Sequence, residues 1–266
     1  MTKEELFAIA ESKHDFRISY YIDEGFKIFK KNVGGFVGIV FINLLISYAL
    51  GLIPYVGQIL SYFISAFISA GMIVVCKKIR SGEETQFSDF FEVFKNSGQF
   101  ILLLLLQFVM ILLAAVPALV IFFVKYYDVF FNLGRPTPQA ILAIIPLMFL
   151  ALIPVLFLGM CYTFSVHIFL FINQDFWTAM EASRKVVMKN WLSMLGFSII
   201  LGLLLIIITV ITCFLGYFVM LPLVVGAIYM AFEDIFKPYA NAFESKIDAF
   251  GSFQKDLNTE ADEKNI

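Results

Sequence analysis

The chain has 266 residues, of which 61% are apolar and 15% are charged, and its formal charge is −2. A soluble domain has about 45–50% apolar and about 25% charged residues, so this composition excludes an ordinary soluble protein, and the negative charge argues against a nucleic-acid partner. Charged residues are also absent from four long runs, as is typical of segments that cross a bilayer. These runs are residues 32–76, 96–124, 136–174 and 190–232.

The first 32 residues form a polar head that precedes the first apolar run. Its apolar residues recur at helical spacing and its charges fall between them, which predicts an amphipathic helix lying in the headgroup layer. The apolar set is Ile18, Ile22, Phe26 and Phe29, and the charged set is Asp23, Lys27 and Lys30. Because this head is too long and too charged for a cleavable signal peptide, we expect the first span to act as its own insertion signal.

The apolar runs predict six membrane-spanning helices, because a bilayer core about 30 Å thick needs about 20 helical residues. The predicted spans are 33–53, 57–76, 98–124, 140–172, 191–212 and 216–232, within a transmembrane domain 33–236 that lies between an N-terminal segment 1–32 and a C-terminal tail 237–266. The fourth is too long for one crossing. We expect Pro146 and Pro154 to break it, which leaves residues 140–150 either as a re-entrant or interfacial piece or as part of the span.

Two later polar segments repeat the pattern of the first. One aligns Phe87, Phe90, Phe91 and Phe94, and the other aligns Phe176, Met180, Ser183 and Val187. In the latter, Glu181, Lys185 and Lys189 have the spacing of helical ion pairs. All three segments end in Lys-Asn before a span. The sequence therefore predicts an all-α bundle with a threefold repeat of amphipathic helix and hairpin, although any three bilayer entries would need polar, basic junctions.

Positive charge predicts the orientation of the chain. Of the nineteen Lys and Arg residues, seventeen fall on one side of the predicted spans, and Lys125 and Arg135 on the other. Cytoplasmic loops are enriched in Lys and Arg. We therefore expect a multi-pass protein of the bacterial inner membrane with both termini in the cytoplasm. The partners to expect are the lipid bilayer and other membrane proteins or lipids, and the sequence does not indicate the oligomeric state.

Motifs for catalysis or for cofactor binding are absent from the sequence. The two histidines, His14 and His167, cannot build a histidine-rich metal site, and no nucleophile, phosphate-binding or dinucleotide motif occurs. The three cysteines have no CxxC spacing. The spans also lack the Asp, Glu, Lys or Arg that ion-coupled transporters carry. We therefore predict no cofactor, no metal and no enzymatic activity.

A few polar or small residues stand out within the spans. Asn43, Gln107 and His167 are the candidate polar intramembrane positions, and Gly57, Ser61, Ser65 and Ser69 form a small-residue ridge. For the two amides, interhelical hydrogen bonds are favoured over a cavity lining. For the histidine, an interfacial ring with a water or backbone partner is favoured over a functional group. For the ridge, close helix packing is favoured over a polar path.

Several short motifs are similar to those of known proteins. They are Ile53-Pro54-Tyr55-Val56-Gly57, Gly71, Ser81-Gly82-Glu83, Phe87-Ser88-Asp89-Phe90-Phe91, Glu181-Ala182-Ser183-Arg184-Lys185, Lys189-Asn190-Trp191, Gly216, Pro222 and Tyr229. Over most of residues 20–235 the chain resembles a group of uncharacterised six-span bacterial proteins, which includes YciC-like proteins and the membrane domain sometimes joined to glycerophosphodiester phosphodiesterases. The resemblance implies the architecture but not a reaction, because the phosphodiesterase domain of some relatives is absent here.

By elimination, the sequence favours a non-enzymatic scaffold, accessory or membrane-homeostasis factor. The alternative is a passive or lipid-handling transporter with the polar positions around a cavity. A weaker alternative is an intramembrane enzyme that modifies lipid, for which His167 would be the best candidate residue.

Overall fold

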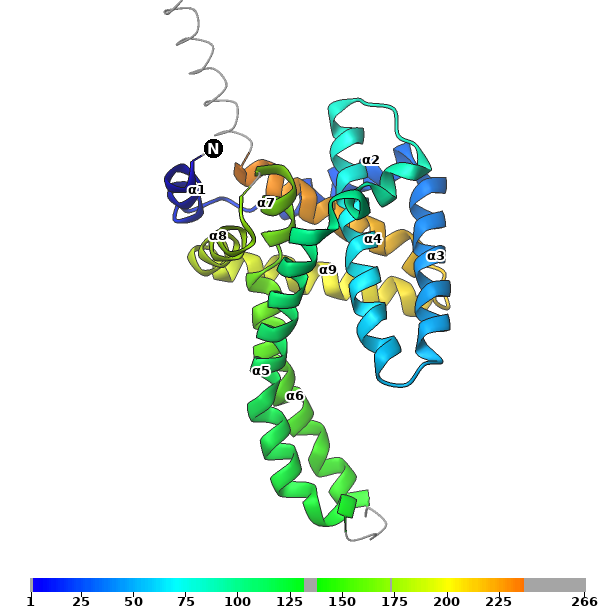
Figure 1. Cartoon of the computed structure of the whole chain (residues 1–266), viewed down its shortest axis with the longest axis vertical. Coiled ribbons are helices and arrows are strands. Elements are labelled where there is room, and N and C mark those ends of the chain that lie inside the picture. The colour runs from blue at the N-terminus through cyan, green and yellow to red at the C-terminus, as the bar shows by residue number, and fades with distance from the viewer. Residues whose placement is uncertain (1, 132–137, 173, 237–266) are drawn as a thin grey trace, which may run out of the picture.

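The computed structural model describes residues 2–131, 138–172 and 174–236. Over these residues the chain is helical and contains no strand, which confirms the all-α class. The predicted tail 237–266 and the loop residues 132–137 lie outside the described part. The helices are α1 (Lys3–Ala10), α2 (Ile18–Lys31), α3 (Val33–Gly51), α4 (Val56–Ser81), the 3₁₀ helix η1 (Phe87–Asn96), α5 (Ser97–Phe131), α6 (Pro138–Cys161), α7 (Ser165–Ile172), α8 (Phe176–Lys189), α9 (Trp191–Ile211) and a final unlabelled helix, Tyr217–Phe236 (Figure 1).

Five described helical segments are long and apolar enough to cross a membrane. They are Val33–Gly51, Val56–Ser81, Leu152–Ile172, Trp191–Ile211 and Tyr217–Phe236. A sixth is obtained when Phe87–Lys95 and Phe100–Leu113, which are bent by 82° at their junction, are counted as one span. The protein is thus a polytopic helical membrane protein with five or six apolar helices of sufficient length.

The predicted break of the fourth span is in the wrong place. Helix α6 continues through both Pro146 and Pro154, so residues 140–150 are part of one helix and not a separate piece. The chain breaks instead at residues 162–164, between α6 and α7. A proline removes one backbone hydrogen bond, which a long helix can tolerate, whereas this break has side-chain partners from a neighbouring helix, described below.

The predicted threefold repeat stays a prediction, and the order of elements can be divided into three units that are compatible with it. The units are α2–α3–α4, then η1–α5–α6, then α8–α9 with Tyr217–Phe236. The middle unit differs, because its first helix is 3₁₀ and its return helix is broken before α7. Figure 1 shows the α3–α4 and α5–α6 hairpins extending to the same side, away from α1, α2, α7 and α8, with α9 running across behind them. We call α1, α2, η1, α8 and the charged ends of the spans the polar layer.

Helix α2 packs one side against the protein core, and the headgroup-layer position of its apolar face stays a prediction. The buried residues are Tyr21, Gly25, Ile28 and Phe29, while Phe26 is exposed. On this buried side, Gly25 lies against the final helix at Gly226. A Cβ atom added to Gly25 would lie 2.7 Å from the backbone nitrogen of Ala227. Two glycines at a crossing allow the helix backbones to touch, and this contact fixes which side of α2 faces inward.

The other two amphipathic segments bury part of their predicted faces. In α8, Met180, Ser183 and Val187, which share the predicted face, are buried within the protein. In η1, Phe90 is fully buried, whereas Phe87 and Phe94 are exposed.

The final helix is the central one. More than half of the apolar window of Tyr217–Phe236 (56%) is buried, against 17% for α3 and for α9. The largest fully buried side chains include Tyr21, Phe36, Phe90, Phe164 and Phe197. The core therefore lies where the polar layer meets the spans, and α3 and α9 present most of their apolar surface outward, as lipid-facing helices do.

Candidate functional site

The predicted polar position in the first span bonds to the ridge of the second. The side-chain oxygen Oδ1 of Asn43 accepts a hydrogen bond of 3.0 Å from Oγ of Ser65. At the start of the ridge, a Cβ on buried Gly57 would lie 1.9 Å from the carbonyl oxygen of Leu50 in α3. Ser61 and Ser69 are half-buried. The ridge thus brings α3 and α4 into close contact, and the hydrogen bond between Ser65 and Asn43 links the two helices.

Gln107 is engaged in the same way on the other hairpin. Its Nε2 donates to Oγ of Ser165 at the start of α7, and that hydroxyl donates to the carbonyl of Tyr162 at 2.6 Å. Gln107 is 9% exposed. Both amides therefore link helices, which is the arrangement that the cost of an unpaired amide in hydrocarbon favours.

The break between α6 and α7 is closed by one hydroxyl from α8. Oγ of Ser183 accepts a hydrogen bond of 3.1 Å from the backbone N–H of Phe164 and donates one of 2.7 Å to the carbonyl of Cys161. All three residues are buried. Because these backbone groups lack helical partners at the break, a side chain that pairs with both removes a cost of several kcal/mol in an apolar setting.

His167 is buried in the protein core, and its position relative to the membrane interface stays a prediction. Its side chain is 3% exposed and its ring lies among Phe164, Tyr229 and Phe232, with centroid distances of 6.3, 6.4 and 5.2 Å. Within the described residues, neither ring nitrogen has a hydrogen-bond partner. The histidine therefore packs as one member of an aromatic cluster, without the polar neighbours that a catalytic base would use.

Ion pairs join the polar layer to the final helix. Arg80 at the end of α4 pairs with Glu24 of α2 at 3.1 Å and with Glu233 at 3.0 Å. Arg17 pairs with Asp234, and the Tyr21 hydroxyl donates to the same carboxylate at 2.7 Å. Burial and this hydrogen bond raise the pKa of Tyr21.

A second set of contacts holds the N-terminal segment on α8. Lys185 pairs with Glu11 at 2.8 Å, and its hydrogen bond and charge lower the pKa of Glu11. Oδ1 of Asn190 accepts from the backbone N–H of His14 at 2.9 Å. The expected pair within α8, Glu181 with Lys185, is replaced by Glu181 with Arg184 at 2.7 Å, because Lys185 is used across helices.

The Lys-Asn junctions do not share one structural role. Asn32 caps α3 by accepting a 3.0 Å hydrogen bond from the N–H of Gly35. Asn190 makes no such cap and binds the N-terminal segment instead.

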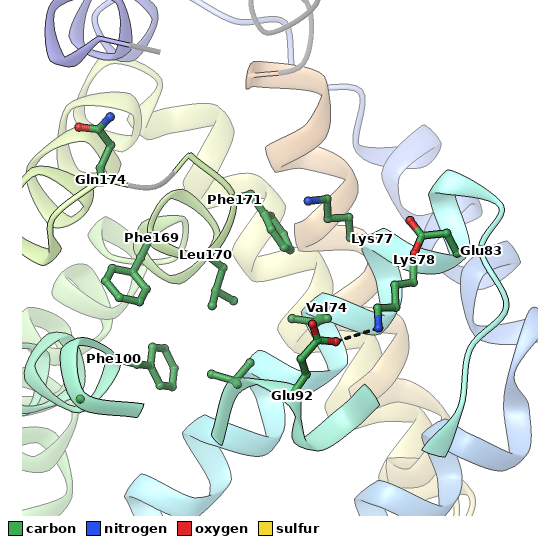
Figure 2. Close-up of a pocket in the computed structure, with 12 residues that line it drawn as sticks. Val74, Lys77, Lys78, Glu83, Glu92, Phe100, Phe169, Leu170, Phe171 and Gln174 are labelled. Atoms are coloured by element: carbon green, nitrogen blue, oxygen red, sulfur yellow. Dashed lines mark ion pairs between the residues drawn. The ribbon is translucent and has the colours of Figure 1, made fainter. Parts of the chain in front are cut away.

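A pocket of about 700 Å³ opens where the polar layer meets the spans, between α4, η1, the start of α5 and α7 (Figure 2). It is lined by Val74, Lys77, Lys78, Glu83, Glu92, Val93, Gly98, Phe100, Phe169, Leu170, Phe171 and Gln174. In Figure 2 the labelled lysines and glutamates come from α4, η1 and the loop between them, with Val74 among them and Phe171 beside Lys77. Phe100, Phe169 and Leu170 lie together on the opposite side of the pocket. The pocket therefore offers a mixed-charge rim beside an aromatic floor.

None of the predicted polar positions lines this pocket. From the sequence, its charged residues are expected only to flank a span or to form one face of an amphipathic helix. The signal available was the pair Lys77-Lys78 followed by Glu83, which brings both signs of charge to one helix end. Their convergence with α7 depends on contacts across about ninety residues of sequence, which periodicity does not predict.

Comparisons with known proteins identify no relative. No family model matches the chain, and neither a curated protein nor a solved structure matches it. Among the described residues, no group of three His, Cys, Asp or Glu side chains is placed to hold a metal ion.

Proposed function

We propose that this protein is a non-enzymatic accessory or scaffold factor of the bacterial inner membrane that acts through its polar layer. The observation that supports the proposal is that the candidate amides within the spans are hydrogen-bonded to neighbouring helices, whereas the charged side chains at the pocket are accessible. Asn43 and Gln107 are bonded to hydroxyls on neighbouring helices. The accessible charge lies in the polar layer, and the pocket opens where that layer meets the spans. Groups that hold helices together contribute to packing, whereas a hollowed, charged surface is available to a ligand.

The polar layer is placed in the cytoplasm under this proposal. The basic residues at the ends of the spans support this side, since Lys and Arg are enriched in cytoplasmic loops. Both tryptophans of the chain lie there as well, Trp177 being 58% and Trp191 53% exposed. Exposed tryptophan is typical of the headgroup level. The six-span bacterial group that the sequence resembles has the same architecture.

The test is purification of the full chain in native lipid particles, followed by measurement of retained lipids and proteins. A matched preparation of an unrelated six-span protein serves as the control. We expect one lipid class or one protein to be enriched reproducibly over that control. Recovery of the protein with bulk lipid composition and nothing else would contradict an accessory role. Solute flux in proteoliposomes would contradict the non-transport part of the proposal.

The runner-up function is lipid handling, which the position of the pocket supports. A cavity at the headgroup level with an apolar floor could pass a lipid between leaflets as well as hold it. The discriminating assay is scrambling of a fluorescent phospholipid in proteoliposomes. Scrambling above protein-free vesicles would favour the runner-up, and its absence would leave the accessory function in place.

A further inference from the structure

The rim of the pocket carries both signs of charge in equal number. Among the residues that line it, Lys77 and Lys78 are cationic and Glu83 and Glu92 are anionic. The two lysines differ in their surroundings. Lys78 is neutralised within the protein, because its ammonium lies 3.0 Å from Asp89 and 2.8 Å from Glu92. The second of these pairs is drawn in Figure 2.

Lys77 is the cation left available for a ligand. Its ammonium lies 4.7 Å from the centroid of the Phe171 ring, and within the described residues it has no carboxylate partner. A cation over an aromatic face is held in place but keeps its hydrogen-bond donors. Phosphate oxygens are strong acceptors for such donors. A phosphate at Lys77 would therefore accept hydrogen bonds from ammonium N–H donors that no carboxylate of the described residues accepts.

The two glutamates of the rim, Glu83 and Glu92, indicate that the ligand carries a positive group as well as a phosphate. A ligand with only negative charge would approach Lys77 beside Glu83 and Glu92, with Asp89 behind them, and would be repelled. A ligand with a phosphate and a nearby ammonium meets Lys77 with one group and a carboxylate with the other. Glu83 is exposed and available for the second contact.

The floor of the pocket is apolar and already packed in place. Phe100 is fully buried and contacts Phe67 and Phe169, with centroids 4.8 and 6.0 Å apart. Phe171 packs against Tyr229 and Phe232 of the final helix. Such a preformed surface binds hydrocarbon without an ordering cost. The volume of about 700 Å³ is in the range of small-ligand sites and accommodates a headgroup with the start of its chains.

We propose that this pocket binds one zwitterionic phospholipid of the surrounding bilayer, with its phosphate at Lys77, its ammonium at Glu83 and the start of its acyl chains on Phe169 and Leu170, which Phe100 supports from beneath. This inference rests on the proposed function and names the ligand through which an accessory factor would sense or organise the bilayer. It also assigns selectivity: phosphatidylethanolamine is preferred over phosphatidylglycerol.

The test uses native mass spectrometry of the delipidated full chain, titrated with phosphatidylethanolamine or phosphatidylglycerol. We expect one phosphatidylethanolamine to bind more tightly than phosphatidylglycerol. Lys77→Gln should weaken phosphatidylethanolamine binding by about tenfold, the effect of one charge-assisted hydrogen bond. The control is Lys30→Gln, because Lys30 also lies over a ring, 4.4 Å from the Phe26 centroid, but outside the pocket. It should leave binding unchanged.

A second variant fills the pocket without disturbing the fold. Gly98 is the second residue of α5 and lines the cavity, and a Cβ added there meets nothing within 4 Å. Gly98→Leu should abolish lipid binding while the thermal midpoint is kept. Gly34→Leu is the matched control, because Gly34 is the second residue of α3 and also has open space beside it. It should bind lipid as the unmodified chain does.

The acidic contact and the source of the phosphate are tested in the same assay. Glu83→Gln should reduce the preference for phosphatidylethanolamine over phosphatidylglycerol. Soluble glycerophosphoethanolamine should fail to compete, because it has the headgroup but not the chains.

The proposal is overturned by equal or tighter binding of phosphatidylglycerol, by full competition from the soluble headgroup, or by unchanged binding in both Lys77→Gln and Gly98→Leu. In that last case an enriched lipid in native particles would still support the accessory function at another site. Conversely, solute flux with the predicted lipid selectivity intact would contradict the function and leave the site in place.

Discussion

The contact between α4 and η1 predicts that one glycine cannot be enlarged. Gly71 is buried in α4, and a Cβ atom added there would lie 1.8 Å from the carbonyl oxygen of Phe90 and 2.7 Å from its carbon. Carbon–oxygen contacts require about 3.3 Å, so η1 would have to move away by about 1.5 Å. The obstacle is backbone, which cannot rotate aside as a side chain can, and Phe90 is fully buried beside it.

The size of the effect follows from two opposing terms. Overpacking of a tight contact costs about 1–3 kcal/mol, while replacing a helical glycine by alanine contributes about 1 kcal/mol in helix propensity. Gly202→Ala in α9 isolates the second term, because a Cβ at Gly202 meets nothing within 4 Å. Gly71→Ala should therefore be about 2 kcal/mol less stable than Gly202→Ala, which corresponds to a thermal midpoint lower by about 4–8 °C.

Thermal unfolding of both variants in the same detergent, followed by helical circular dichroism, measures this difference. Hydrogen exchange over residues 87–96 provides a second readout, since η1 would separate locally if the rest of the bundle stays folded. Equal midpoints together with equal exchange in η1 would refute the close approach of these two helices.

Two further predictions concern contacts that are distant in sequence. Ser183→Ala should lower the free energy of unfolding by about 2–3 kcal/mol, because two buried backbone groups at the break lose their partner. Thermal unfolding measures this loss, and Ser193→Ala, whose side chain is exposed, is the control. A loss no larger than that of the control would contradict the prediction. Protection of α1 from hydrogen exchange should depend on pH through Glu11. Its pKa is lowered by Lys185 from the ordinary 4.5, so the contact is complete above that value and is lost as the pH falls through the lower, folded value. Glu11→Gln should show the weakened protection already at neutral pH, and unchanged exchange in α1 would exclude the contact.

The sequence predicts well those features that depend on composition along the chain. The uncharged runs locate the apolar helices, because a span has to be free of charge over its whole length. The hydrogen bond from Ser65 to Asn43 also agrees with the preference expected for an amide in hydrocarbon. Predictions from local sequence fail where a residue distant in the sequence determines the local structure. Two prolines predicted a break that lies instead where Ser183 of α8 supplies the missing partners.

The faces of the amphipathic helices show the same limit. Periodicity groups Phe26 and Phe29 on one face of α2, but it does not show that Phe29 packs in the core while Phe26 is exposed, which depends on the close contact of Gly25 with Gly226. The pocket could not be predicted either, since Lys77 and Phe171 are far apart in the sequence and come together only in the folded chain. Sequence patterns thus locate the apolar helices, while the site depends on contacts between helices that are distant in the sequence.

Labelling of single cysteines from outside intact cells tests the membrane arrangement most directly. Cys213 is exposed at the turn between α9 and the final helix, and Glu84 lies in the loop between α4 and η1. With Cys213 as the only cysteine, a membrane-impermeant maleimide should react in intact cells. With a single cysteine introduced by Glu84→Cys, the reagent should react only after the membrane is permeabilised. Reaction of both positions from the same side would contradict the alternation of the spans and the assignment of the polar layer to the cytoplasm.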